Sequence, residues 1–203
     1  MKTLESSAKG EFEAKGSRFL CFLLLFASVQ EFHAFLENLK LAHQKAVHFV
    51  YAYREINELG QIVERSSDDG EPKGSSGVPV LNVLRGEELV SCGAIVVRYF
   101  GGTLLGVGGL VRAYTKATQE ALKSAKDAAL IRPYVKLESL SLCVAYSHLN
   151  ALQYQINAMG LACEKEFLND KVALHIRGEK HQLDALLKHL NEHFNGCFEV
   201  LAK

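Results

Sequence analysis

The sequence predicts an α+β protein of two domains. Short apolar segments rich in β-branched and aromatic residues, which favour strands, alternate with longer segments whose apolar residues recur at helical spacing. The chain has 203 residues, a length that suits two small domains. Pro133 stops any helix from continuing past it, and the order of expected elements changes there. We therefore expect one domain over residues 1–131 and a second over residues 132–203.

The first domain is expected to mix strands and helices. Ser28 followed by Glu31 is the pattern of a capping box, which opens a helix. Pro79 is tolerable because it falls in the first turn of another helix. The expected elements are strands over 11–27, a helix over 29–42, strands over 47–53 and 61–65 joined by a turn over 57–60, and a short helix over 78–84.

The second domain shows a different order of elements. Gly160 is well placed to end a helix, and Asn169 and Asp170 fit the turn of a hairpin. The order β-α-β-β-α-β in about 70 residues predicts a ferredoxin-like split βαβ fold. The expected elements are strands over 134–146, 161–168, 172–177 and 197–201, and helices over 147–159 and 179–194.

The first domain contains a glycine-rich loop between a predicted buried strand (91–100) and a long predicted helix (110–126). Five glycines in nine residues permit backbone angles that other residues resist. A strand, a flexible loop and the start of a helix together form a place where backbone N–H groups can point at an anion. The loop is thus a candidate phosphate-binding element, with the candidate residues Gly101, Gly102, Gly106, Gly108 and Gly109.

The long helix carries a stripe of positive charge. At about 100° per residue, Arg112, Lys116, Lys123 and Lys126 fall on one side, away from the face that should pack on the sheet. Beside the glycine loop and Arg98, this stripe suits a phosphate backbone. A solvated helix face with no ligand explains the same pattern equally well.

The overall composition limits the classes of function. Lys and Arg together equal Asp and Glu at 23 each, so any nucleic-acid binding must come from a local patch. Five widely spaced cysteines without a CxxC motif indicate reduced thiols in a cytoplasmic protein. The apolar segment 19–27 is too short to span a bilayer, and acidic residues precede it. We expect a cytoplasmic protein that does not bind membranes.

A polar loop over 66–77 contains the acidic residues Asp68, Asp69 and Glu71. Their oxygens in a glycine-rich loop could bind Mg²⁺ or Ca²⁺ or a protein partner, although a solvated turn is the commoner explanation. His48 lies inside an apolar strand, where a hydrogen-bonded core histidine is more frequent than a catalytic base. The sequence matches no P-loop, GxGxxG or GxSxG motif, so it indicates no catalytic residue, metal or cofactor.

Three segments resemble the YigZ/IMPACT family. They are Gly16-Ser-Arg-Phe19, Ser67-Asp-Asp-Gly-Glu-Pro72, and the run from Val97 through the glycine loop to Tyr114. The long glycine motif is highly specific, and His48 stands where the family usually has a histidine. The resemblance covers residues 10–126 well, whereas the second domain carries no sharp motif.

The resemblance implies a fold and a cellular context. The first domain should be similar to the second domain of ribosomal protein S5, and the two domains together should resemble the last two domains of elongation factor G. Eukaryotic members restrain a starvation-responsive kinase pathway that controls translation initiation, by protein–protein competition.

Three functional hypotheses follow from these observations. The favoured one is a non-enzymatic cytoplasmic protein that associates with RNA or the ribosome through Arg98, the glycine loop and the basic stripe. The second is an enzyme or binding protein for a phosphorylated small molecule or nucleotide, with His48 as a base and a metal on the acidic residues. The third is a pure protein-interaction module with no nucleic-acid role, which the neutral overall charge permits.

Overall fold

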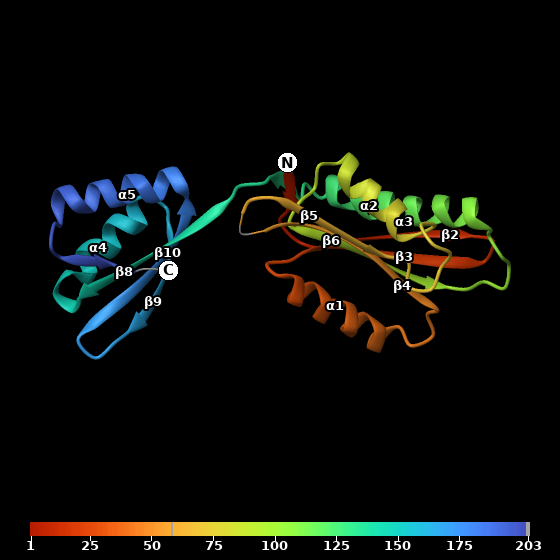
Figure 1. Cartoon of the computed structure of the whole chain (residues 1–203), viewed down its shortest axis with the longest axis horizontal. Helices are drawn as coiled ribbons and strands as arrows, with labels where there is room; N and C mark the ends of the chain where they lie inside the picture. Colours follow the sequence, from red (N-terminus) through yellow and green to blue (C-terminus); the bar gives the residue numbers. More distant parts are fainter. Residues whose placement is uncertain (58, 202–203) are drawn as a thin grey trace. The chain divides into compact units, whose positions relative to one another are not determined.

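The computed structural model describes residues 1–57 and 59–201, and it divides the chain into two compact units (Figure 1). The N-terminal unit is Met1–Tyr134 and the C-terminal unit is Val135–Lys203. The expected boundary after residue 131 lies three residues before this division. Both units combine helices with antiparallel sheets, which confirms the predicted α+β class.

The N-terminal unit is built on a five-stranded sheet in the order β2-β3-β6-β4-β5, and each neighbouring pair is antiparallel. The central strand β6 is buried along most of its length because helices cover the sheet on both faces. The strands are β2 (Ala8–Ala14), β3 (Ser17–Leu25), β4 (His48–Ile56), β5 (Ile62–Ser67) and β6 (Cys92–Tyr99).

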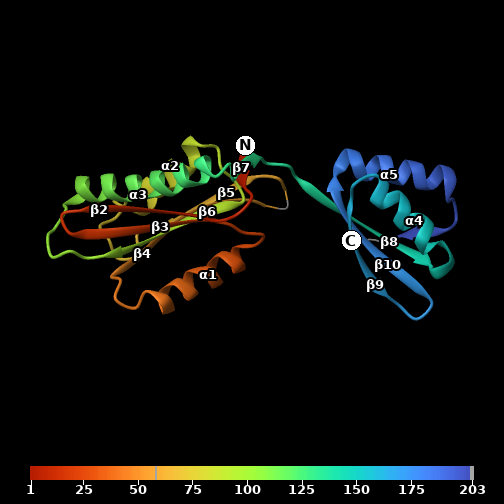
Figure 2. The ribbon, with the colours of Figure 1, turned by 180° about the vertical axis from the view of Figure 1, so that it is seen from behind.

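One face of this sheet is covered by α1 (Val29–Ala42) (Figures 1 and 2). The Ser28 side chain accepts a hydrogen bond from the Glu31 N–H, and the Glu31 carboxylate accepts one from the Ala27 N–H, so the predicted helix start is confirmed. Phe32 and other apolar residues of α1 pack against Phe22, Tyr53 and Ile95 of the sheet.

The other face is covered by α2 (Gly77–Gly86) and α3 (Val107–Asp127) (Figure 2). Helix α3 lies over β2 and β3 and approaches β2 very closely at Gly10. A Cβ atom on Gly10 would lie 2.0 Å from the Ala121 backbone nitrogen, so only glycine fits this position. The strand and the helix backbone are therefore in direct contact.

A two-stranded ribbon joins the beginning and the end of the N-terminal unit. Strand β1 (Lys2–Leu4) pairs with β7 (Ile131–Pro133), and the Tyr134 N–H donates to the Met1 carbonyl at 3.2 Å. Neither strand is among the elements expected from the sequence. Three-residue strands are too short to show an alternating pattern, and their pairing joins segments about 130 residues apart.

The C-terminal unit has the predicted order β-α-β-β-α-β and a four-stranded antiparallel sheet in the order β11-β8-β10-β9. Helices α4 and α5 contribute Leu152, Ile156, Leu183, Leu186 and Leu190 to its core. Its elements are β8 (Leu137–Ala145), α4 (Tyr146–Ala158), β9 (Ala162–Phe167), β10 (Lys171–Glu179), α5 (Lys180–His193) and β11 (Phe198–Val200).

Two further expectations, on the cysteines and on membrane spans, can be compared with the structure, and a third includes a residue that is not described. The turn expected over 57–60 includes Glu58, which lies outside the described residues. Burial raises the pKa of both Cys21 and Cys92 to about 12, so these thiols are protonated and unreactive at neutral pH. Within residues 1–57 and 59–201, the helices are too short or too polar to cross a membrane.

Candidate phosphate-binding site

The first glycine of the loop over residues 101–109 has a structural role. A Cβ atom on Gly101 would lie 1.9 Å from the carbonyl carbon of Gly16, and the Gly101 N–H donates to the Ser17 hydroxyl at 3.1 Å. The loop is therefore anchored on the turn between β2 and β3. Lys15 lies in the same turn, and it lines one hollow together with Leu105 and Gly109 of the loop.

Helix α3 begins inside the glycine loop, at Val107 rather than at the expected residue 110. Gly106 has φ = +69° and precedes the first turn, which contains Gly108 and Gly109 and no acidic residue. The first hydrogen bond within the helix runs from the Leu110 N–H to the Gly106 carbonyl. The preceding N–H groups belong to a positively polarised helix end.

Three of the four basic residues of the stripe, Arg112, Lys116 and Lys123, are exposed on α3 and have no acidic neighbour in ion-pair range among the described residues. Lys126, one turn further along, does pair with Glu87. The basic stripe is therefore available to an external anion at its N-terminal end.

Arg112 and Lys116 line a hollow of about 700 Å³ together with Lys15, and we call it the basic groove. It lies between α3 and the end of β2, and Ala14 of β2 and Gly109 of α3 are among its lining residues. Its remaining lining residues are Phe12, Leu105, Val111, Ala113, Thr115 and Gln119. The groove thus combines an apolar floor with three cationic side chains.

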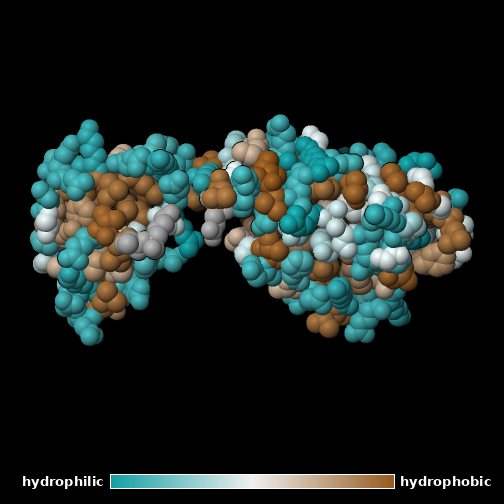
Figure 3. All heavy atoms as spheres, viewed as in Figure 1, coloured by the Kyte–Doolittle hydropathy of each residue, from teal (hydrophilic) through white to brown (hydrophobic). Residues whose placement is uncertain are grey.

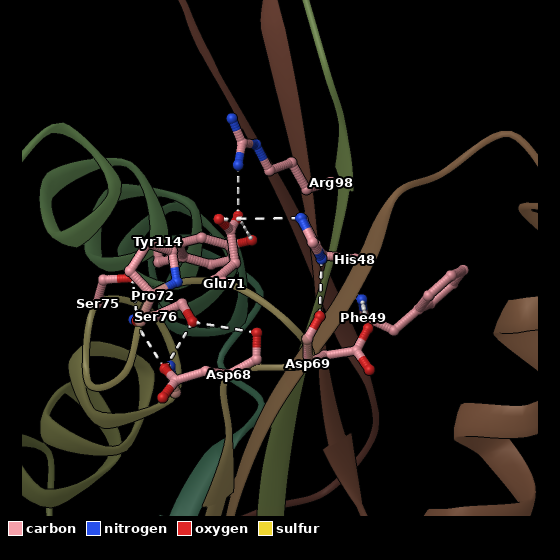
Figure 4. Close-up of polar contacts among 11 residues, drawn as sticks. His48, Phe49, Asp68, Asp69, Glu71, Pro72, Ser75, Ser76, Arg98 and Tyr114 are labelled. Carbon is pink, nitrogen blue, oxygen red and sulfur yellow. Dashed lines mark hydrogen bonds and ion pairs between the residues drawn. The ribbon is translucent and has the colours of Figure 1, made fainter. Parts of the chain in front are cut away.

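Arg98, predicted as a phosphate contact, lies instead in a buried polar network with Glu71 and Tyr114. Its side chain is 6% exposed, and its Nη1 donates to Glu71 Oε1 at 2.5 Å (Figure 4). The Tyr114 hydroxyl donates to the same oxygen at 2.7 Å. Burial, together with this hydrogen bond, raises the pKa of Tyr114 above its usual value. The charge of Arg98 is therefore compensated inside the protein.

The acidic loop, which we define as Asp68, Asp69 and Glu71, is tied to the fold by several hydrogen bonds. The Asp68 carboxylate accepts from the backbone N–H groups of Gly74, Ser76 and Gly77 and from the Ser76 hydroxyl, at 2.7–3.1 Å. Asp68 thereby caps the start of α2. Burial alone raises its pKa, but the hydrogen bonds outweigh burial and hold the pKa below the usual value.

His48 contacts the acidic loop and is partly exposed. Its Nδ1 lies 2.7 Å from the Asp69 carbonyl oxygen, which can only accept, so Nδ1 carries the proton. Its Nε2 lies 3.9 Å from Glu71 Oε2, and the Asp69 carboxylate accepts from the Phe49 N–H at 2.6 Å (Figure 4). His48 therefore holds the acidic loop against β4.

The hydrogen bonds of the acidic loop and of His48 can be compared with the metal-binding and enzyme hypotheses. The carboxylates of Asp68, Asp69 and Glu71 point to different hydrogen-bond donors rather than to one common centre. Among residues 1–57 and 59–201, no group of three or more His, Cys, Asp or Glu side chains is arranged to hold a metal ion. The basic groove is lined by none of the acidic loop residues and not by His48.

The predicted phosphate-binding residues that line the basic groove all lie on one of its walls. Of the residues predicted to bind phosphate, Arg112, Lys116 and Gly109 line the groove; those that do not are Arg98, Lys123, Gly101, Gly102, Gly106 and Gly108. Phe12, Ala14 and Lys15 form the opposite wall and were not among the predicted site residues. No local pattern marks them, because their place beside α3 follows from the sheet order.

Comparisons with known proteins give a family relationship. Residues 15–122 match the family model described as the Impact N-terminal domain. The IMPACT family member YvyE of Bacillus subtilis (strain 168) is 42% identical over 120 residues, which are 59% of this chain and 54% of that protein. The chain thus spans about half the length of this curated relative.

Two further relatives match over more of the chain. An IMPACT family member in the pol 5′ region of Thermus thermophilus is 36% identical over 163 residues, covering 79% of this chain and 83% of that protein. The crystal structure of a protein described as hypothetical is 26% identical and has a TM-score of 0.73, with coverage of 100% of this chain and 96% of that chain. The matched Impact N-terminal domain contains the acidic loop, Lys15 and the α3 wall of the basic groove, and the chain belongs to the IMPACT family.

Proposed function

We propose that this protein associates with RNA, in the cytoplasm and as part of translation control, through the basic groove. One observation carries the proposal. Lys15 on one wall and Arg112 and Lys116 on the other line a single hollow, and none has an acidic partner in the described ranges. Their charges can be neutralised by the phosphates of a bound polymer, which releases counterions and favours binding.

The charge balance of the whole chain favours an RNA contact that is confined to a local patch. The formal net charge is zero, so the protein as a whole does not attract a polyanion. Arg98 takes no part in this proposal because Glu71 already compensates its charge. Membership of the IMPACT family supports the link to translation, because the resemblance to this family implies a role in translation control.

The test is co-sedimentation of the protein with ribosomes at about 50 and 200 mM salt, a range over which binding through several phosphates weakens steeply. We expect binding at the lower salt concentration, little at the higher one, and much weaker binding by the variant Arg112→Ala/Lys116→Ala. A variant Lys45→Ala/Lys73→Ala removes the same charge from exposed positions outside the groove and should still bind. Equally weak binding by both variants would contradict a specific groove.

A protein partner is the second candidate function. The glycine loop and the residues beside it expose Phe100 (47%), Leu104 (81%) and Val107 (57%). Figure 3 shows hydrophobic surface at this end of the N-terminal unit. Exposed apolar side chains grouped on one loop are a frequent feature of protein interfaces. Salt-insensitive binding to ribosomes, abolished by Leu104→Ser, would favour this candidate over phosphate contacts.

A further inference from the structure

We propose that the basic groove takes one unpaired nucleotide of a single-stranded RNA, with its base on the apolar floor and its flanking phosphates on the cationic walls. This inference rests on the proposed RNA association and names the class of RNA. It follows from the size, the lining and the charge arrangement of the groove.

The size of the groove fits a nucleotide. A volume of about 700 Å³ lies within the range of about 300–1,000 Å³ found for small-molecule sites. Phe12, Leu105 and Val111 offer apolar surface to a base, and Thr115 and Gln119 offer hydrogen-bonding groups to its edge. A flat cationic surface would need neither the hollow nor the apolar lining in order to bind phosphates.

The cations lie on two sides of this floor. Arg112 and Lys116 are one helical turn apart on α3, and Lys15 belongs to the turn after β2 on the opposite wall. A strand that crosses the groove can therefore place one phosphate on each wall and the base between them. Lys123, about 16 Å along the helix from Arg112, extends the same charged face outside the hollow.

A duplex does not meet these requirements. Its bases are stacked and paired inside the double helix, so none of them can reach the apolar floor. An A-form duplex presents phosphates and sugars to a protein surface and would contact only the rim of the groove. A base of a single strand is free to enter a pocket and to pack on an aromatic ring such as Phe12.

The experiment measures fluorescence anisotropy of the full chain with three labelled RNAs at about 50 mM salt. The RNAs are a ten-nucleotide uridine strand, a duplex of the same length, and a ten-unit abasic strand of equal charge. We expect the uridine strand to bind at least about fivefold more tightly than the abasic strand, the low end of a single stacking contact. It should also bind more tightly than the duplex.

Two variants test whether the preference for the uridine strand arises in the basic groove. Ala14→Leu fills the groove with an aliphatic side chain and should remove the preference for the uridine strand over the abasic strand. Lys123→Ala lies outside the groove and should weaken the binding of both strands by the same factor. Thermal denaturation reports whether Ala14→Leu is folded; the three-RNA comparison on the unmodified protein stands without it.

The outcomes separate this inference from the proposed function. Equal binding of all three RNAs, with strong salt dependence, would overturn the nucleotide pocket and leave the RNA association intact. Binding of none of them would overturn both. Preference for the duplex would also overturn the pocket and would assign the cations to the outside of a double helix.

Discussion

The acidic loop and the basic groove belong to the same unit, and they differ in how their charges are satisfied. Asp68, Asp69 and Glu71 each receive hydrogen bonds from neighbouring elements, so their charges stabilise the fold. Arg112 and Lys116 are exposed and have no ion-pair partner in the described part of the chain. The difference shows that a charged loop can be structural while a helix face of opposite charge remains available to a ligand.

The largest effect is expected from Glu71→Ala. The substitution leaves the buried guanidinium of Arg98 without its counter-charge, which typically costs about 3–5 kcal/mol of stability. Urea denaturation followed by circular dichroism gives the free energy of unfolding. The control Tyr114→Phe removes one hydrogen bond to Glu71 and should cost only about 1 kcal/mol. If Glu71→Ala cost no more than this control, the network would not be structural.

A smaller effect, about 1–2 kcal/mol, is expected from Asp68→Ala, because the substitution removes the cap from the start of α2. The pKa of Asp68 is lowered by folding, so its contribution is complete above the unfolded-state pKa of about 3.9. It is lost as the pH falls through the lower folded-state value. The free energies of unfolding of the unmodified protein and of Asp68→Ala, measured against pH, should therefore converge at acidic pH and separate above about pH 4. A difference between them that does not change with pH would argue against an ionised cap.

The smallest effect on stability is expected from Arg112→Ala/Lys116→Ala. Exposed, unpaired cations away from packing contacts typically change the free energy of unfolding by no more than about 0.5 kcal/mol. The same variant should reduce the salt dependence of RNA binding. The slope of log K against log salt should fall by about 0.7 for each phosphate of a single strand that the protein no longer neutralises. Destabilisation comparable to that of Asp68→Ala would show that these residues support the fold instead.

The sequence predicted most elements of the fold because their periodic patterns are local. The boundaries of the helix over 29–42 agree with the structure, and all six elements of the C-terminal unit were found within three residues. The buried role of Arg98 was not predictable, because Glu71 and Tyr114 reach it from distant parts of the chain. Lys15 was missed for the same reason, since the residues across the groove from it belong to α3, far along the chain.

The β1–β7 ribbon has a consequence for how this fold can be combined with others. Met1 and Tyr134 are joined by a hydrogen bond, so the chain enters and leaves the N-terminal unit at one point. A unit whose two ends lie together can be inserted into a loop of another protein, or joined to a different companion domain, without rearrangement of its sheet. The N-terminal unit can therefore be combined with different domains while its fold, and with it the basic groove, stays the same.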